Sequence, residues 1–285
     1  MFVREKVIKA ILDSGENFMS GEQLSKKLGI SRTAVWKHIN ALREEGYNIE
    51  SVNKKGYRLA EKPDDILSSE NIAYNLPTEF IGKKVIHLDT VGSTNDYAKE
   101  IGNKVSGGTL IISEQQTKGK GRLGRVWKSK SGDGIWMSLI IKPKIEPYKA
   151  PFLTLVAGAS VVKALSNLGV EASIKWPNDI IVHNKKICGI LTELSAEMER
   201  VNYVVIGIGI NIKTIDFPDE IKEKATSLYK EGYKLSRVDI VRQFCIEFEK
   251  LYKGYILDGN KQDTLELCRK YSAIIGKQVY VIKEN

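Results

Sequence analysis

Residues 114–132 read Glu-Gln-Gln-Thr-Lys-Gly-Lys-Gly-Arg-Leu-Gly-Arg-Val-Trp-Lys-Ser-Lys-Ser-Gly, and the eight residues from Lys118 to Arg125 hold three glycines and four cationic side chains. Glycine lets main-chain N–H groups approach a ligand closely and adopt positive φ angles. Lysine and arginine neutralise negative charge, and arginine does so with a fork of paired donors. Residues 118–128, named the glycine segment below, therefore have the composition of an anion-binding loop. The ordinary alternative is a solvated basic loop.

The spacing Gly119-x-Gly121-x-x-Gly124 also matches the dinucleotide-binding fingerprint, which has to follow a strand and open a helix. Residues 109–113 are β-branched and apolar, and they predict the required strand. Residues 126–134 lack helical periodicity and are rich in lysine, serine and glycine. Because no helix is predicted there, the sequence argues against a Rossmann dinucleotide site.

Composition limits the function classes that need to be considered. A chain of 285 residues is long enough for two domains, and its net charge of +9 favours polyanionic partners. No apolar run is long enough to span a membrane, and the N-terminal residues do not resemble a secretory signal. The three cysteines have no disulfide or zinc-site spacing, so we expect free thiols in the cytoplasm.

The N-terminal residues carry the signals of a helix-turn-helix. Ser20-Gly-Glu-Gln23 forms a capping box, and Ser31 is a second N-cap after the turn at Gly29. A basic hairpin is predicted at residues 47–59, which together with the helices gives a winged helix-turn-helix. Any three-helix unit with a hairpin would look similar, but the two caps and the basic wing favour DNA binding. The residues expected at the DNA are Ser31, Arg32, Thr33, Trp36, Lys37, Lys54 and Lys55.

A polar linker with a proline, residues 61–65, predicts a domain boundary, which we place after residue 62. The following body, residues 63–273, alternates mainly antiparallel strand signals with a few helices. That pattern predicts an α+β domain with a mixed sheet and helices on one face. Residues 93–95, Ser-Thr-Asn, lie at a predicted helix start, where they are either an ordinary N-cap or a polar ligand site. The residues alone do not choose between those two.

Four motifs occur in order behind the winged helix: Gly119-Lys-Gly-Arg-Leu-Gly-Arg125, Lys175-Trp-Pro-Asn-Asp179, Lys186-x-x-Gly-Ile-Leu191 and Gly207-x-Gly-x-Asn211. Together they resemble the bifunctional biotin protein ligases that also repress the biotin operon. The resemblance covers nearly the whole chain. It implies a class II synthetase-like mixed sheet that makes biotinyl-5′-AMP from biotin and ATP. Mg²⁺ enters with the nucleotide, and the protein itself is expected to hold no metal.

The resemblance also assigns candidate residues. Those implied at biotin are Ser93, Thr94, Asn95, Gln116, Lys120, Gly121, Arg122 and Lys186. Those implied at ATP and the adenylate are Arg122, Arg125, Trp127, Asn178, Lys186 and Asn211. Arg122, Lys186 and Asp179 are the candidate catalytic residues. The reaction brings a carboxylate and a triphosphate together, so Arg122 and Lys186 are expected to offset their repulsion. Asp179 is expected to orient or deprotonate the incoming lysine amine, and the glycine segment to order over the ligand and exclude water.

The resemblance implies three partners: a biotin carboxyl carrier protein, operator DNA, and a second copy of the chain when biotinyl-AMP is bound. It also implies an SH3-like C-terminal module, of which residues 274–285 are expected to supply only a first strand. This departure leaves a repressor with weak or no ligase activity as an alternative. A lipoate-type ligase is a further alternative, which the motifs at 119–125 and 175–179 argue against.

Overall fold

The structure is a computed structural model, and it describes residues 3–60 and 65–278. The chain divides into two compact units, Met1–Asn75 and Leu76–Asn285, and each is described by itself. The first unit extends past the expected boundary at residue 62. It does so because Ile66 and Tyr74 pack against its core, and the Tyr74 hydroxyl donates a hydrogen bond to the Leu12 carbonyl.

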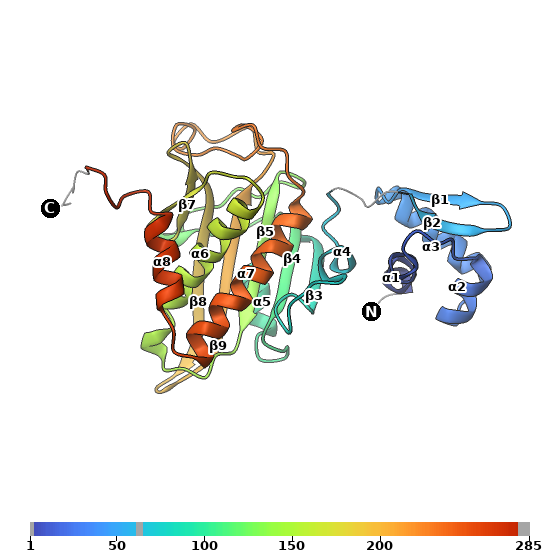
Figure 1. The fold of residues 1–285 in the computed structure, drawn as a ribbon, viewed down its shortest axis with the longest axis horizontal. Helices are drawn as coiled ribbons and strands as arrows, with labels where there is room; N and C mark the ends of the chain where they lie inside the picture. The colour runs from blue at the N-terminus through green and yellow to red at the C-terminus, as the bar shows by residue number, and fades with distance from the viewer. Residues whose placement is uncertain (1–2, 61–64, 279–285) are drawn as a thin grey trace. The chain divides into compact units, whose positions relative to one another are not determined.

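The first unit is a winged helix-turn-helix (Figure 1). Its elements are α1 (Val3–Ser14), α2 (Gly21–Leu28), α3 (Arg32–Glu44), β1 (Ile49–Val52), β2 (Gly56–Leu59) and α4 (Ser69–Ala73). The predicted capping box is present at Ser20, and Ser31 accepts a hydrogen bond from the main-chain N–H of Ala34 as the predicted N-cap of α3. Gly29 ends α2 in the left-handed region with φ 69°, which glycine adopts without strain.

The wing is tied to the helices by main-chain pairing. Met19 and Tyr57 exchange two hydrogen bonds of 2.9 Å, so the turn before α2 lies along β2. A side chain at Gly56 would collide with the main chain of Met19 and Ser20, which explains the glycine there. The core beneath consists of fully buried aliphatic side chains from the three helices, including Ile8, Leu24 and Ile39.

The second unit is built on a seven-stranded sheet in the order β3-β4-β5-β9-β8-β7-β6. The strands are β3 (Val85–Val91), β4 (Thr109–Gln116), β5 (Gly134–Ile141), β6 (Ser173–Lys175), β7 (Asp179–Val182), β8 (Lys185–Glu197) and β9 (Arg200–Asn211). The pair β3–β4 is parallel and the other pairs are antiparallel, so the predicted mixed sheet is confirmed.

The helices α6 (Phe152–Asn167), α7 (Arg237–Leu257) and α8 (Gln262–Lys270) lie over one face of this sheet, as predicted (Figure 1). Ile190 of β8 points to that face, because its side chain lies next to Gly158 of α6. The neighbouring Leu191 pairs with Gly207, and a side chain at Gly207 would collide with Asn95 of α5 (Thr94–Ile101). Since successive residues of a strand face opposite sides, α5 lies on the other face. The predicted arrangement with helices on one face therefore describes α6 to α8 but not α5.

Helix α6 is the apolar centre of the unit. The stretch Pro147–Asn167 is long and apolar enough to cross a membrane by length and composition, yet 61% of that window is buried inside the protein. That burial is typical of a core helix. After α8, Lys277 donates its N–H to Ile274 in a turn. The expected SH3-like strand falls mostly on residues 279–285, which lie outside the described residues.

Candidate functional site

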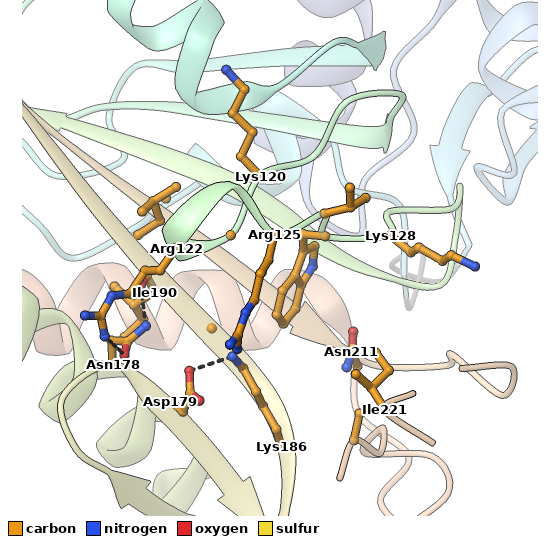
Figure 2. Close-up of a pocket in the computed structure, with 18 of the residues that line it drawn as sticks. Lys120, Arg122, Arg125, Lys128, Asn178, Asp179, Lys186, Ile190, Asn211 and Ile221 are labelled. Atoms are coloured by element: carbon orange, nitrogen blue, oxygen red, sulfur yellow. Dashed lines mark hydrogen bonds and ion pairs between the residues drawn. The ribbon is translucent and has the colours of Figure 1, made fainter. Parts of the chain in front are cut away.

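The face of the sheet that carries α5 also carries a cavity of about 790 Å³. Its walls come from the glycine segment, the start of α5, strands β7 to β9, and the loop of residues 214–225. Figure 2 shows the cationic part of this cavity. The sequence-predicted site residues that line it are Ser93, Thr94, Asn95, Gln116, Lys120, Gly121, Arg122, Arg125, Trp127, Asn178, Asp179, Lys186 and Asn211. All the predicted biotin-side and nucleotide-side residues therefore meet in one place.

The glycine segment folds as a hairpin over this cavity. At the base of the hairpin, just outside the segment, Gln116 pairs with Ser129 through the main chain. Nearer the tip, Lys120 lies opposite Val126. Two further hydrogen bonds, from Trp127 N–H to the Gly119 carbonyl (2.9 Å) and from Gly121 N–H to the Arg125 carbonyl (2.7 Å), extend the ladder. The tip is a 3₁₀ turn, Arg122–Gly124, with Leu123 at φ 56° and 90% exposed.

Trp127 fixes the hairpin to the sheet. A Cβ at Gly209 would come within 2.5 Å of the Trp127 Nε1, and one at Gly189 within 2.9 Å of its ring. The two strand glycines pair with each other across β8 and β9, and they form a flat floor on which the indole rests. In the described part of the chain, the buried Trp127 Nε1–H has no hydrogen-bond partner.

Cationic side chains line this part of the cavity. Lys186 Nζ lies 2.6 Å from Asp179 Oδ1 and 5.3 Å from the centroid of the Trp127 ring. In Figure 2 the side chain of Arg125 extends towards Lys186 and Asp179. Arg122 Nη1 donates to Asn178 Oδ1 at 2.7 Å, so this arginine holds an amide at the opposite wall. Seven cationic side chains and four carboxylates line the cavity, so its lining carries a net positive charge, which suits a negatively charged ligand.

The other end of the cavity is neutral and polar. The Gln116 Oε1 accepts hydrogen bonds from the N–H (2.8 Å) and hydroxyl (3.1 Å) of Thr94, and its Nε2 donates to the Ser129 hydroxyl. The Ser138 hydroxyl lies 2.8 Å from Thr94 Oγ1 and 2.6 Å from Asn95 Oδ1. Ser138 is fully buried and does not itself line the cavity, but it fixes two residues that do. The sequence did not reveal this supporting role, because a single serine inside the apolar strand β5 carries no local signal.

The Ser-Thr-Asn cluster serves as a cap and a cavity wall at once. Ser93 caps α5 by accepting the N–H of Asp96, while Thr94 and Asn95 are almost fully buried against the sheet. Thr94 and Asn95 present hydroxyl and amide groups at the rim of the polar end. Asn211, at the end of β9, donates its amide to the Thr226 carbonyl at 3.1 Å and lines the far wall.

The loop of residues 214–225 is a second wall that sequence reasoning missed. Phe217 and Ile221 line the cavity there, although neither belongs to a recognisable motif. The loop is held close because Lys186 N–H donates to the Lys224 carbonyl and Thr226 N–H to the Lys186 carbonyl. The residue that supplies the ammonium group therefore also anchors this wall through its main chain.

Lys120 is placed differently from the other predicted cations. In Figure 2 its side chain points away from Arg125 and Lys186. Its ammonium lies 2.6 Å from Asp96 Oδ2. Partial burial acts to raise the pKa of Asp96, but hydrogen bonds from Lys120 and Lys99 outweigh it and hold that pKa below its usual value. The described residues contain no cluster of histidine, cysteine, aspartate and glutamate that would hold a metal.

The residues expected at DNA lie on the surface of the first unit. Ser31, Arg32 and Thr33 are exposed at the start of α3, followed by Trp36, which is 57% exposed, and Lys37. Lys54 and Lys55 are exposed at the turn of the wing, where Lys54 adopts φ 67°. Together they give the first unit an exposed basic helix end and an exposed basic turn.

Comparisons with known proteins agree with this arrangement. A family model described as "Biotin/lipoate A/B protein ligase family" matches residues 88–211, and one described as "HTH domain" matches residues 3–58. The bifunctional ligase/repressor BirA of Bacillus subtilis is 46% identical over 262 residues, which are 90% of this chain and 80% of that protein. The Escherichia coli BirA is 38% identical over 230 residues, 80% of this chain and 70% of that protein.

Among solved structures, a biotin protein ligase from Aquifex aeolicus in complex with biotin and ATP superposes with a TM-score of 0.60. It is 32% identical in sequence and covers 68% of this chain and 81% of that one. The winged helix, the sheet with its cavity and the extent of these matches lead to one conclusion. The chain belongs to the family of bifunctional biotin protein ligases and biotin operon repressors.

Proposed function

We propose that this chain is an ATP-dependent biotin–protein ligase and a biotin-responsive repressor whose single cavity holds biotin at its polar end and the adenylate at its cationic end. The observation that carries this proposal is that Arg122, Arg125 and Lys186 line the same cavity as the hydrogen-bonded polar residues Thr94, Asn95 and Gln116. A molecule with a neutral polar head and an anionic tail matches that division of charge.

In the first step, a biotin carboxylate oxygen attacks the α-phosphorus of ATP. The bond from this phosphorus to the oxygen that bridges to the β-phosphate breaks, and pyrophosphate leaves with the bonding electrons and with the Mg²⁺. Both reactants are anions, so the barrier includes their mutual repulsion. The ammonium of Lys186 and the guanidinium groups of Arg122 and Arg125 are the groups that offset it. They act in a site partly shielded from water, where such interactions are stronger than in bulk solvent.

Lys186 is well prepared for this work. The Asp179 carboxylate 2.6 Å away and the Trp127 ring both favour the charged ammonium and restrict its position. A cation that is already oriented needs no reorganisation when charge develops on the α-phosphate. Arg122, held by Asn178 across the cavity, completes the enclosure of the anhydride from the side of the hairpin tip.

In the second step, a lysine amine of the carrier protein attacks the acyl carbon of biotinyl-AMP, and AMP leaves as the phosphate takes the bonding electrons. The amine has to be neutral to attack. Asp179 is the carboxylate next to the reacting centre, and we assign to it the orientation of the amine or the acceptance of its proton. Its pairing with Lys186 means that the two steps share one ion pair.

The first unit supplies the repressor function. The exposed start of α3 and the basic turn of the wing suit the major groove and flanking phosphates of operator DNA. We further propose that bound biotinyl-AMP favours a homodimer, which would present two winged helices to a palindromic operator. A protein that binds operator DNA works beside the chromosome, and we propose a cytoplasmic location.

The direct test mixes the full chain with Mg·ATP, biotin and a biotin carboxyl carrier domain and examines the products by mass spectrometry. We expect biotinyl-AMP, pyrophosphate, and a carrier biotinylated at one lysine. Adenylate without any labelled carrier would favour the repressor without transfer activity. Absence of both biotinyl-AMP and labelled carrier would contradict the proposed ligase.

A further inference from the structure

A chain of alternating charges runs along the outside of the polar end of the cavity. Lys120 of the hairpin contacts Asp96 Oδ2 (2.6 Å), and Asp96 Oδ1 contacts Lys99 (3.0 Å). Lys99 also contacts Glu193 Oε1 (2.9 Å), and Glu193 Oε2 accepts a hydrogen bond from Asn95 Nδ2 (2.7 Å). This series of charged contacts therefore begins on the glycine segment and ends at the amide of Asn95, a buried residue that lines the cavity.

Its position gives this chain of charges a role that the catalytic cations do not have. Side chains attach the glycine segment to the body at three described points: Trp127 on the glycine floor, Arg122 on Asn178, and Lys120 on Asp96. The first two lie on the side of β7 to β9. The third lies on the side of α5, directly beyond the polar end where Thr94 and Asn95 stand.

We propose that Asp96 is a positioning residue: through its ion pair with Lys120 it clasps the hairpin to α5 and so keeps the polar end of the cavity closed over bound biotinyl-AMP. Lys99 contacts Asp96, and Glu193 contacts both Lys99 and Asn95. These two side chains therefore fix the carboxylate that binds Lys120 and the amide that lines the cavity. This inference rests on the proposed ligase function, because it concerns retention of the intermediate.

The exposure of the charges sets the size of the effect. The Lys120 and Asp96 side chains are 49% and 37% exposed, and those of Lys99 and Glu193 are 36% and 30% exposed. Pairs this accessible to water are individually weak and are screened by salt. A clasp of this kind is therefore expected to change the dissociation rate of a ligand severalfold, and to leave the chemistry of Arg122 and Lys186 intact.

The test measures how fast the full chain releases biotinyl-AMP. The wild type and Asp96→Asn are loaded with labelled biotin and Mg·ATP in the presence of pyrophosphatase, desalted rapidly, and followed by filtration. At about 0.05 M NaCl we expect Asp96→Asn to release the adenylate about fivefold faster, the size that a partly exposed ion pair supports. At about 1 M NaCl, where the Debye length is about 3 Å, the two rates should converge.

Three further variants separate the clasp from a general loss of structure. Asp96→Glu, which keeps the charge, should restore most of the slow release. Asp89→Asn removes an exposed carboxylate that pairs with no cation in the described ranges, and should release at the wild-type rate. In a Lys120→Met background, Asp96→Asn should add less than about twofold, because the partner is already gone.

The outcomes distinguish the two proposals. A wild-type chain that forms no biotinyl-AMP overturns the proposed ligase and the clasp with it. A wild type that forms and retains the adenylate, beside an Asp96→Asn chain that releases it equally slowly at low salt, overturns the clasp alone. An equal effect of Asp96→Asn with and without Lys120 also overturns it, since Asp96 would then act through the helix end.

Discussion

Lys186 is fixed by contacts from three directions. Asp179 lies 2.6 Å from its ammonium, the Trp127 ring lies 5.3 Å away, and its main chain pairs with Lys224 and Thr226. This arrangement holds a positive charge in the cavity before any ligand arrives, so no free energy is spent on orienting it during the reaction.

We expect Lys186→Met to slow the formation of biotinyl-AMP about 100-fold, because removal of one preorganised charge typically costs about 3 kcal/mol in the transition state. Pyrophosphate release in a single-turnover assay measures this step. Lys185→Met, one residue earlier and directed elsewhere by the alternation of β8, is the matched control. A rate within twofold of wild type would remove Lys186 from the reacting centre.

Gly209 forms part of the floor under Trp127. Gly209→Ala places a Cβ about 2.5 Å from the indole nitrogen, so the ring has to lift and carry the hairpin with it. We expect weaker binding of biotin and ATP, and a destabilisation of about 1–3 kcal/mol typical of overpacking. Calorimetric titration and thermal unfolding measure the two effects.

Gly254→Ala is the control for that substitution, because nothing lies within 4 Å of the added Cβ in helix α7. It should leave ligand binding unchanged and raise the melting temperature slightly, since alanine favours a helix over glycine. If Gly209→Ala bound both ligands as the wild type does, contact between the indole and the sheet would not be what holds the hairpin in place for binding.

Among the secondary-structure elements, helix α7 fixes the segment that leads into strand β3 through one carboxylate. Glu249 accepts hydrogen bonds from the main-chain N–H groups of Glu79, Phe80 and Ile81, at 2.7, 2.9 and 2.9 Å. Burial acts to raise its pKa, but these hydrogen bonds and Lys253 outweigh it and hold the pKa below the usual value of 4.5. The segment before β3 depends on this charge.

The pH dependence follows from the direction of that shift. A carboxylate with a depressed pKa in the folded state stabilises the protein above its unfolded pKa, and the stabilisation is lost as pH falls through the folded value. We expect Glu249→Gln to lower the stability by about 1–3 kcal/mol at pH 7. The difference should shrink as pH falls below about 4.5, because the wild-type carboxyl then becomes protonated too.

Urea unfolding at a series of pH values tests this prediction. Glu247→Gln is the matched control, because Glu247 is a partly exposed residue of the same helix whose one described hydrogen bond, from Asn167, a glutamine can keep. A Glu249→Gln deficit that stayed constant down to acid pH would mean that packing, and not the charge, holds the segment.

The elements also show what sequence can and cannot predict. The caps at Ser20, Ser31 and Ser93 were predictable because a cap depends on residues three positions apart. The motif residues could be assigned to one site because they resemble a family. The contribution of Ser138 could not be predicted, because it depends on the packing of α5 against the face of β5 to which Ser138 points.

The reason for the strand glycines Gly189 and Gly209 is visible only in the structure. A glycine inside a strand is typical of a place where another group approaches the main chain closely, and at Gly189 and Gly209 the structure identifies that group as Trp127 from the same chain. Lys120 is a residue whose contact could not be predicted from its motif. Its type and motif position suggested an anion contact, yet its nearest described charge is Asp96, a residue remote in sequence and outside every motif.

At the scale of the whole molecule, the two units carry separable functions. Trp36 is 57% exposed on α3 and contributes nothing to the described cavity. We expect Trp36→Ala to weaken operator binding about tenfold, the size of one lost contact at a base edge, while the rate of carrier biotinylation stays at the wild-type value. Gel-shift titration at fixed salt and the transfer assay measure the two activities.

The same chain should show coupling in the other direction when ligands are present. Biotin with Mg·ATP is expected to raise operator affinity, and Lys186→Met should abolish that gain by preventing adenylate formation. Added biotinyl-AMP should restore part of it. Equal loss of ligase activity and DNA binding in Trp36→Ala would contradict the separation of the two functions.

A crystal structure of the chain after incubation with biotin and Mg·ATP would show directly whether one cavity holds the intermediate. We predict one molecule of biotinyl-AMP, with its phosphate within hydrogen-bond distance of Lys186 and Arg122 and its ring system against Thr94, Asn95 and Gln116. A molecule bound elsewhere, or one in this cavity with both cations remote from the phosphate, would contradict it.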